Sequence, residues 1–221
     1  MSKRRQRSFV VIGLGTFGRT VSTELARYGD HVLGIDIDEH KVSSLSDILA
    51  EAVIADGRDE DALRETGAGN YDVALVAIGE DLEANILCTM NLKQIGVPCV
   101  WVKALDRVHH RILSRLDVDK VIHPEQEIGQ HIAQMLHNPL VRDYINIGNG
   151  FFIVDFTLPE QLDGQQIATL ELMEKFNIRC LGLLRHGEFL PCEAATTILK
   201  TDDKLLLFGD RSHLRAFGET L

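Results

Sequence analysis

The sequence lacks an excess of positive charge, and this absence excludes a large class of functions. Its 221 residues hold 23 lysines and arginines against 33 aspartates and glutamates, a formal net charge of −10. A nucleic-acid-binding protein needs a basic face that displaces counterions from phosphates, so no nucleic-acid partner is expected. The one basic cluster, residues 3–7, is interpreted as a solvated tail or, alternatively, as an electrostatic contact with a partner or a membrane.

Long apolar runs are also missing. No stretch approaches the roughly 18 apolar residues of a membrane-spanning helix. The basic cluster is not followed by the apolar core of a secretory signal. We therefore expect a cytoplasmic protein with no bilayer-crossing segment of its own.

Cysteine is scarce, and its spacing does not suggest a metal or redox motif. The four cysteines are Cys88, Cys99, Cys180 and Cys192, and none belongs to a C-x-x-C pair. We interpret all four as reduced thiols of a cytosolic protein.

Residues 1–137 alternate short apolar runs with amphipathic segments, and this pattern predicts the fold. Continuous apolar runs of this kind are typical of parallel strands buried on both faces. With a right-handed helical crossover after each strand, they predict an α/β fold, a doubly wound Rossmann-like parallel sheet of six strands in the order 3-2-1-4-5-6. The expected strands are residues 9–13, 31–36, 51–55, 71–78, 99–102 and 120–122.

The alternation of apolar runs and amphipathic segments ends at residues 138–150. This segment contains Asn138-Pro139 and Gly148-Asn149-Gly150 and is interpreted as a connection between domains. Residues 151–221 are expected to form a second, smaller α+β domain. Its predicted strands and helices are residues 151–158 (strand), 166–176 (helix), 178–185 (strand), 204–208 (strand) and 211–217 (helix).

Three glycines, Gly13, Gly15 and Gly18, follow the first predicted strand in the G-x-G-x-x-G spacing of a dinucleotide-binding turn. Gly13 permits the tight turn, Gly15 lets the backbone approach a phosphate, and Gly18 lets the helix pack against the strand. Thr16 and Phe17 lie inside the same turn. The free N–H groups and partial positive charge of the helix N-terminus favour an anion there.

Two carboxylates follow the second predicted strand. Asp36 lies 18 residues after Gly18, where a carboxylate accepts hydrogen bonds from a ribose hydroxyl. Asp38 adds negative charge and is the better candidate for the N-cap of the next helix. Together they disfavour a 2′-phosphate, so NAD(H) or an adenine nucleotide is expected rather than NADP. The alternative for Asp36 is a solvated turn residue.

Three further strand ends face the same edge of the predicted sheet. Asp56 and Gly57 follow the third strand near the expected adenine end of the crevice, Gly79 follows the fourth, and Lys103 follows the fifth. Lys103 is placed to reach phosphates. Each has an ordinary alternative: a strand-end turn, a helix-capping turn and a solvated lysine, respectively.

Glu125 opens the helix after the sixth strand, in the segment IHPEQEIG. It is either a helix-dipole partner or the ligand of a hard divalent cation such as Mg²⁺ or Ca²⁺ beside a phosphate. The sequence shows no catalytic constellation around the turn. A small NAD-dependent oxidoreductase nevertheless remains the alternative function, and a free-standing nucleotide-binding regulator is a weaker third.

Taken in order, these segments resemble the RCK (KTN) domain of regulatory subunits in bacterial potassium uptake systems, of the KtrA and TrkA type. The resemblance covers nearly the whole chain. The segments that carry it are FVVIGLGTFG, VLGIDID, VIADGRDE, DVALVAIGED, VWVKA and VIHPEQEIG.

The resemblance implies a non-enzymatic subunit at the cytoplasmic face of the cell membrane. It implies homodimers that assemble into an octameric ring on a membrane potassium transporter of the KtrB or TrkH type, and a ring that changes shape with ATP, ADP or NAD(H). Carried over by position, the glycines would hold phosphate, Asp36 ribose, and Glu125 a divalent cation. Some relatives bind cyclic di-AMP in the TrkA-C domain, but no residue pattern here is specific enough to predict it.

Thr16 departs from the family pattern, in which many members carry arginine at this position. Threonine is too short and uncharged to reach a γ-phosphate. The resemblance therefore leaves the preferred nucleotide open. Arg19, three positions after Thr16, either substitutes in part or is simply an exposed residue of the helix.

Overall fold

The computed structural model describes residues 6–137, 140–192 and 197–220. Most of the basic cluster and the Asn138-Pro139 pair lie outside these residues. The chain divides into two compact units, Met1–Glu125 and Gln126–Leu221, which we describe separately. No helix in the described ranges has the length and apolar character needed to cross a membrane.

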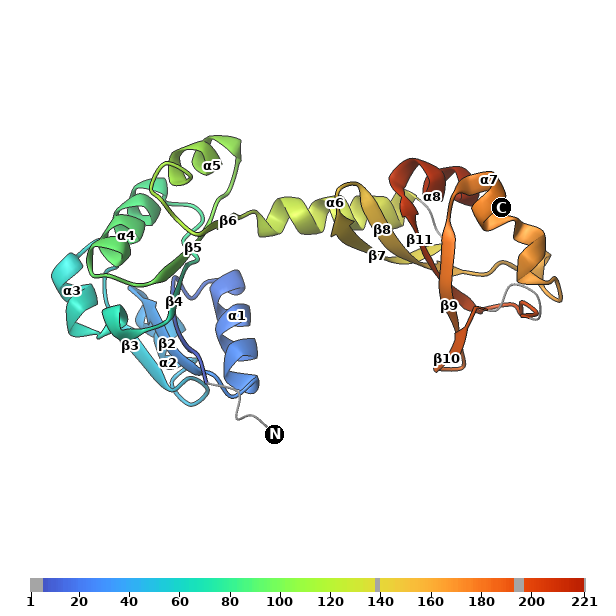
Figure 1. Ribbon diagram of the computed structural model, residues 1–221. Helices are drawn as coiled ribbons and strands as arrows, with labels where there is room; N and C mark the ends of the chain where they lie inside the picture. The colour runs from blue at the N-terminus through green and yellow to red at the C-terminus, as the bar shows by residue number, and fades with distance from the viewer. Residues whose placement is uncertain (1–5, 138–139, 193–196, 221) are drawn as a thin grey trace. The chain divides into compact units, whose positions relative to one another are not determined.

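The first unit is built on a six-stranded parallel sheet in the order β3-β2-β1-β4-β5-β6, and this confirms the predicted Rossmann-like topology (Figure 1). Its strands are β1 Ser8–Ile12, β2 His31–Asp36, β3 Glu51–Ile54, β4 Val73–Val76, β5 Cys99–Lys103 and β6 Lys120–Ile122.

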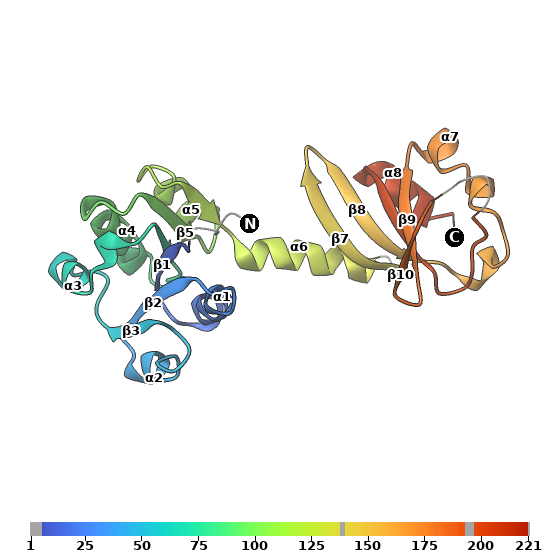
Figure 2. The same cartoon turned by 60° about the horizontal axis from the view of Figure 1, so that its bottom comes forward.

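Helices cover both faces of this sheet (Figure 2). Successive side chains of a strand point to opposite faces, so Val10 belongs to the core cluster with Leu92 of α4, whereas Val11 packs in the cluster with Phe17 of α1. The unit's helices are α1 Thr16–Arg27, α2 Glu39–Ser43, α3 Glu60–Glu65, the 3-10 helix η1 Ala68–Asn70, α4 Leu82–Gln94 and α5 Arg107–Leu113.

The second unit is a five-stranded antiparallel sheet in the order β10-β9-β11-β8-β7 with short helices, which confirms the predicted smaller α+β domain. Helix α6 (Pro124–His137) starts in the last residues of the first unit. The other elements are β7 Val141–Gly148, β8 Phe151–Thr157, η2 Glu160–Leu162, η3 Ile167–Leu170, α7 Leu172–Phe176, β9 Arg179–Arg185, β10 Glu188–Pro191, β11 Lys204–Asp210 and α8 Arg211–Gly218.

The segment interpreted as a connection, residues 138–150, contains a strand instead. β7 is an edge strand paired with β8. Gly148, Asn149 and Gly150 all have positive φ and form the turn between these two strands. The glycine-rich break in the sequence therefore marks a hairpin rather than a linker, because exposed polar residues on an edge strand obscure its alternation.

The helix predicted over residues 166–176 is interrupted. Glu171 adopts the left-handed conformation, with φ of 46°, and separates η3 from α7. The apolar spacing was helical in period, but a non-glycine residue at positive φ ends the hydrogen-bonded ladder.

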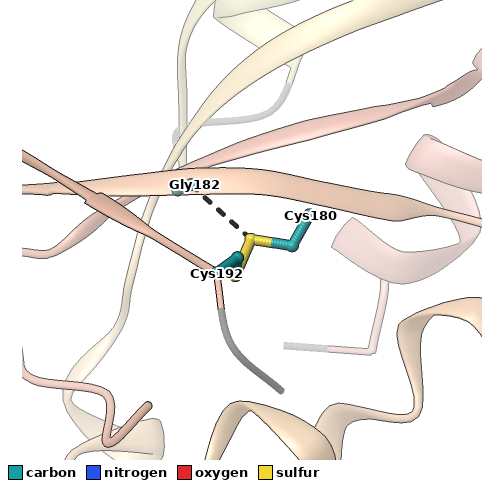
Figure 3. Close-up of a disulfide and its surroundings, with 3 residues drawn as sticks. All are labelled: Cys180, Gly182 and Cys192. Atoms are coloured by element: carbon teal, nitrogen blue, oxygen red, sulfur yellow. Dashed lines mark hydrogen bonds between the residues drawn. A yellow bond between two sulfur atoms is a disulfide. The ribbon is translucent and has the colours of Figure 1, made fainter.

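The interpretation of all four cysteines as free thiols is wrong for two of them. Cys180 of β9 and Cys192, which follows β10, form a disulfide (Figure 3). The hairpin brings them together across 12 residues of sequence, a pairing that spacing alone does not reveal. Cys88 and Cys99 of the first unit are free.

A buried ion pair ties the end of β9 to the start of β11. Arg185 donates two hydrogen bonds to Asp203, from Nε at 2.8 Å and from a terminal nitrogen at 2.6 Å. The Asp203 side chain is only 1% exposed. Burial would raise the pKa of Asp203, but the hydrogen bonds from Arg185 and the Lys200 N–H outweigh it and hold the pKa below its usual value.

We expect Asp203→Asn to destabilise the second unit by about 3 kcal/mol at neutral pH, because Arg185 loses its buried partner. The lowered pKa means that the wild-type pair stabilises the fold above the carboxyl's unfolded pKa and ceases to do so as pH falls through the folded value. The difference between wild type and variant should therefore shrink in acid. Urea unfolding followed by far-UV circular dichroism measures it, with fluorescence of Trp101, the single tryptophan, as a control on the first unit. An equal loss at neutral and acid pH would contradict the expectation.

Candidate functional site

The glycine turn brings α1 into close contact with β1. Gly13 has φ of +93°, and its N–H donates to the Ile35 carbonyl at 2.8 Å. A Cβ on Gly18 would lie 1.9 Å from the Gly13 carbonyl oxygen. These two glycines are therefore required by packing, because no side chain fits between the strand and the helix.

Gly15 is different, since a Cβ there would meet nothing within 4 Å. It is the N-cap of α1, with no side-chain hydrogen bond at the cap and no acidic residue in the first turn. The helix N-terminus therefore points unneutralised partial positive charge at open space, where it can receive a phosphate.

Thr16 and Arg19 do not place a cation at this N-terminus. Thr16 is exposed at the first position of α1. Arg19 donates to the Ser44 hydroxyl at 3.1 Å, which commits its guanidinium to the end of α2. Arg19 is exposed on α1, and its partial substitution for the arginine of other family members stays a prediction.

Asp36 is buried beside the turn, 7% exposed, at the end of β2. One carboxylate oxygen accepts the Leu14 N–H at 2.7 Å, and the other accepts the Asp38 N–H at 2.9 Å. The Lys41 ammonium lies 3.4 Å from Asp36 and 4.0 Å from Asp38. Asp38 caps α2 by accepting the His40 N–H, as its sequence position predicted.

Asp56 and Gly57 follow β3. Asp56 is ion-paired with Arg58 at 2.7 Å, and the hydrogen bond from Arg58 holds the pKa of Asp56 below its usual value. A Cβ on Gly57 would lie 3.0 Å from the Cys88 sulfur. Gly57 is thus buried in the core, whereas Asp56 is half-buried and partnered by a cation.

The Lys103 ammonium is surrounded by residues from three other elements or loops, namely Phe17, Gly79 and Glu125. Lys103 is 8% exposed and its ammonium lies 5.7 Å from the centre of the Phe17 ring. A Cβ on Gly79 would come within 3.1 Å of that ammonium. Lys103 is ion-paired with Glu125 at 2.5 Å. Burial would raise the pKa of Glu125, but the hydrogen bond from Lys103 lowers it below its usual value.

In this structure Glu125 is therefore the partner of a buried lysine. Within the described residues, no group of three or more histidine, cysteine, aspartate or glutamate side chains could hold a metal ion by itself. Glu125 is more than half exposed, with 55% of its side chain accessible.

Sequence reasoning missed three residues that shape this site. Asn85 of α4 is buried, and its amide donates to the carbonyls of Ile78 and Lys103, which ties together the ends of β4 and β5. Lys41 and Arg58 each neutralise a predicted ligand carboxylate. Their short spacing from Asp38 and Asp56 was a usable signal, but nothing in the sequence marks Asn85.

The arrangement can bind an anion at the N-terminus of α1 and hydroxyl groups at Asp36. Oδ1 of Asp36 accepts one backbone N–H and keeps a second lone pair for a ligand, whereas Oδ2 accepts from both the Leu14 N–H and the Lys41 ammonium. The exposed side chain of Ile37, 65% accessible, adds an apolar surface next to Asp36.

Comparison with known proteins gives two family matches, a TrkA-N domain over residues 9–124 and a TrkA-C domain over residues 152–221. Ktr system potassium uptake protein A of Bacillus subtilis is 34% identical over 217 residues, 98% of each chain. Ktr system potassium uptake protein C of the same organism is 33% identical over 212 residues, 96% of each chain.

Among solved structures, the RCK domain of GsuK matches 99% of this chain and 48% of its own, with a TM-score of 0.64 and 13% identity. The GsuK channel bound to NAD matches 98% of this chain and 40% of its own, with a TM-score of 0.65 and 13% identity. These likenesses show that the fold is shared.

The second and third glycines of the turn, Gly15 and Gly18, predict losses of different size for the same substitution. We expect Gly18→Ala to cost about 1–3 kcal/mol of stability, because α1 must move away from β1. Gly15→Ala should change stability by less than about 0.5 kcal/mol, because its Cβ meets only solvent. Urea unfolding followed by Trp101 fluorescence compares them, and equal losses would refute the packing difference.

Proposed function

This chain belongs to the family of potassium uptake proteins that combine a TrkA-N with a TrkA-C domain, and we propose that it is the nucleotide-sensing regulatory subunit of a membrane potassium uptake system. The observation that carries the proposal is the open N-terminus of α1 beside the buried Asp36, in a chain that matches Ktr potassium uptake protein A over its whole length. The oxidoreductase alternative gains no support from relatives, which are named as potassium uptake proteins.

The ligand we propose is NAD(H) or an adenine nucleotide. Its phosphates would lie at Gly15 and its adenosine ribose at Asp36. The GsuK channel bound to NAD, which shares this fold, is consistent with such a ligand. Lys41 offsets part of the negative charge at Asp36, so discrimination against a 2′-phosphate should be partial rather than absolute.

Lys103 and Glu125 would respond to the ligand together. The ammonium of the buried Lys103 lies next to the Phe17 ring of the turn. A phosphate that enters the turn would compete with Glu125 for this ammonium. A phosphate that takes Lys103 would release the exposed Glu125 carboxylate. Released in this way, Glu125 would contribute to a Mg²⁺ or Ca²⁺ site together with the nucleotide's own oxygens.

Self-association through α6 is the second part of the proposal. Ile128, Ile132 and Leu136 repeat every four residues on this helix and are 62%, 42% and 79% exposed. Such a stripe on one face is typical of a helix that packs on another helix. We propose that it supports homodimers within an octameric ring docked on the cytoplasmic face of a membrane potassium transporter.

Regulation would then be a shift of population between ring conformations. A nucleotide that binds one conformation more tightly moves the equilibrium by its difference in affinity and by no more. The Lys103–Glu125 ion pair is the element proposed to differ between the liganded and unliganded states.

We expect NADH, NAD, ADP and ATP to raise the unfolding temperature of the wild-type chain, with a gain of about 2.7 kcal/mol at a ligand concentration one hundred times its Kd. NADPH should stabilise less than NADH. Thermal denaturation followed by Trp101 fluorescence is the measurement, with and without Mg²⁺. Gly15→Ala should abolish the nucleotide effect, and Glu125→Gln only its Mg²⁺-dependent part.

The same variants separate nucleotide binding from transport. In a bacterial host without its own potassium uptake, the chain together with a Ktr-type membrane subunit should restore growth at low potassium, and Gly15→Ala should not. Nucleotide stabilisation without any restored uptake would contradict the transport role while leaving the binding site intact.

The exposed apolar stripe on α6 predicts that the protein self-associates, which the mass of the particles in solution tests. We expect ring-sized particles for the wild type in size-exclusion chromatography with light scattering, and smaller species for Ile128→Glu with Ile132→Glu. Gln126→Glu, which adds a charge at an exposed position of the same helix, is the matched control. A monomeric wild type, or an unchanged mass in the double variant, would refute the role of α6.

A further inference from the structure

The disulfide of the second unit lies at the edge of its sheet. Cys180 belongs to β9, and Cys192 immediately follows β10, the edge strand of the sheet. Their Cα atoms are 6.2 Å apart, within the range for a disulfide. Figure 3 shows the bond bridging the two strands of this hairpin.

Local structure brings the two sulfurs together. Pro191 of β10 pairs with Gly182 of β9 as the last pair of the hairpin. Cys192, the residue after Pro191, therefore lies close to the residues that precede Gly182 in β9. Leu181 is the extra residue of a β-bulge, because Leu206 pairs with Gly182 whereas Leu207 pairs with Cys180. The bulge places Cys180 beside Cys192 without a register in which they face each other directly.

Both cysteines are half-buried, and both lie against the core cluster of the second unit. The remaining cysteines, Cys88 and Cys99, lie in the first unit. Cys88 is fully buried, and desolvation raises its pKa far above the usual value, which makes it unreactive. Thiol chemistry in the second unit is therefore confined to this pair.

The bond closes a short loop at an accessible sheet edge. It adds a cross-link to a strand, β10, that is otherwise held to β9 by four residue pairs. Leu199 is buried and its N–H donates to the Gln165 carbonyl at 2.8 Å, so this residue is held in the unit independently of β10. Breaking the disulfide would thus loosen the hairpin while the core of the unit stays folded. Three of the four residues of β10 are exposed, and disulfides are more labile at exposed positions than in a protein interior.

We propose that Cys180 and Cys192 form a reversible redox modification site that reacts with low-molecular-weight disulfides such as oxidised glutathione. In the forward direction one cysteine thiolate attacks the small disulfide, which forms a mixed disulfide and releases one small thiol. The second cysteine thiolate then attacks the protein sulfur and releases the other small thiol. The protein pair loses two electrons and two protons, and the small disulfide is reduced to two thiols.

The test is equilibration of the full chain in a series of reduced and oxidised glutathione mixtures, followed by acid quench, alkylation under denaturing conditions and peptide mass spectrometry. We expect Cys180 and Cys192 to become protected together in one transition. The midpoint of this transition should depend on the square of the reduced glutathione concentration divided by the oxidised glutathione concentration, because two small thiols are released for each protein disulfide formed. Cys180→Ser and Cys192→Ser should each give a glutathione adduct on the remaining cysteine.

Cys99→Ser is the matched control, since this half-buried thiol of the first unit lies outside the pair, and it should leave the transition unchanged. The oxidised wild type should also unfold at a temperature roughly 5–15 °C higher than the reduced form or the double serine variant, as measured for the second unit by circular dichroism. Thiols that stay open to alkylation in every mixture would overturn the proposal, and so would a disulfide that persists in reduced glutathione.

Discussion

The contact between Gly18 of α1 and the Gly13 carbonyl is the constraint on which the first unit depends. Because no side chain fits there, the helix lies directly against β1. Its N-terminus begins at Gly15, where the space in front of the backbone is open to solvent. The same turn presents the Leu14 N–H to Asp36, so the carboxylate proposed to bind ribose is held by the backbone that would hold the phosphate. Packing and binding geometry thus share one cause.

The charged side chains of the site are paired with one another within the protein. A buried cation needs a partner, and Lys103 finds one in Glu125, as Asp36 finds Lys41. In the proposed function, a ligand's phosphate would replace Glu125 as the partner of Lys103, and the site would then have two charge arrangements. A regulatory subunit needs such a pair of states, whereas strong binding to one rigid state would not transmit a signal.

The second unit is stabilised by different means. Its antiparallel sheet buries one face against short helices, and the Arg185–Asp203 ion pair joins β9 to β11 inside it. The disulfide between Cys180 and Cys192 acts at the opposite, edge side of β9.

The sequence by itself determined the topology of the first unit and the positions of Gly13, Gly18 and Asp36. Apolar periodicity and glycine spacing are local properties, and each strand–helix unit of the parallel sheet shows them directly in the sequence. Tertiary structure alone decided which of the strand-end residues meet. The Lys103–Glu125 pair joins residues 22 positions apart, and the Cys180–Cys192 bond depends on a bulge. Such contacts follow from strand register and side-chain burial, which no local pattern encodes.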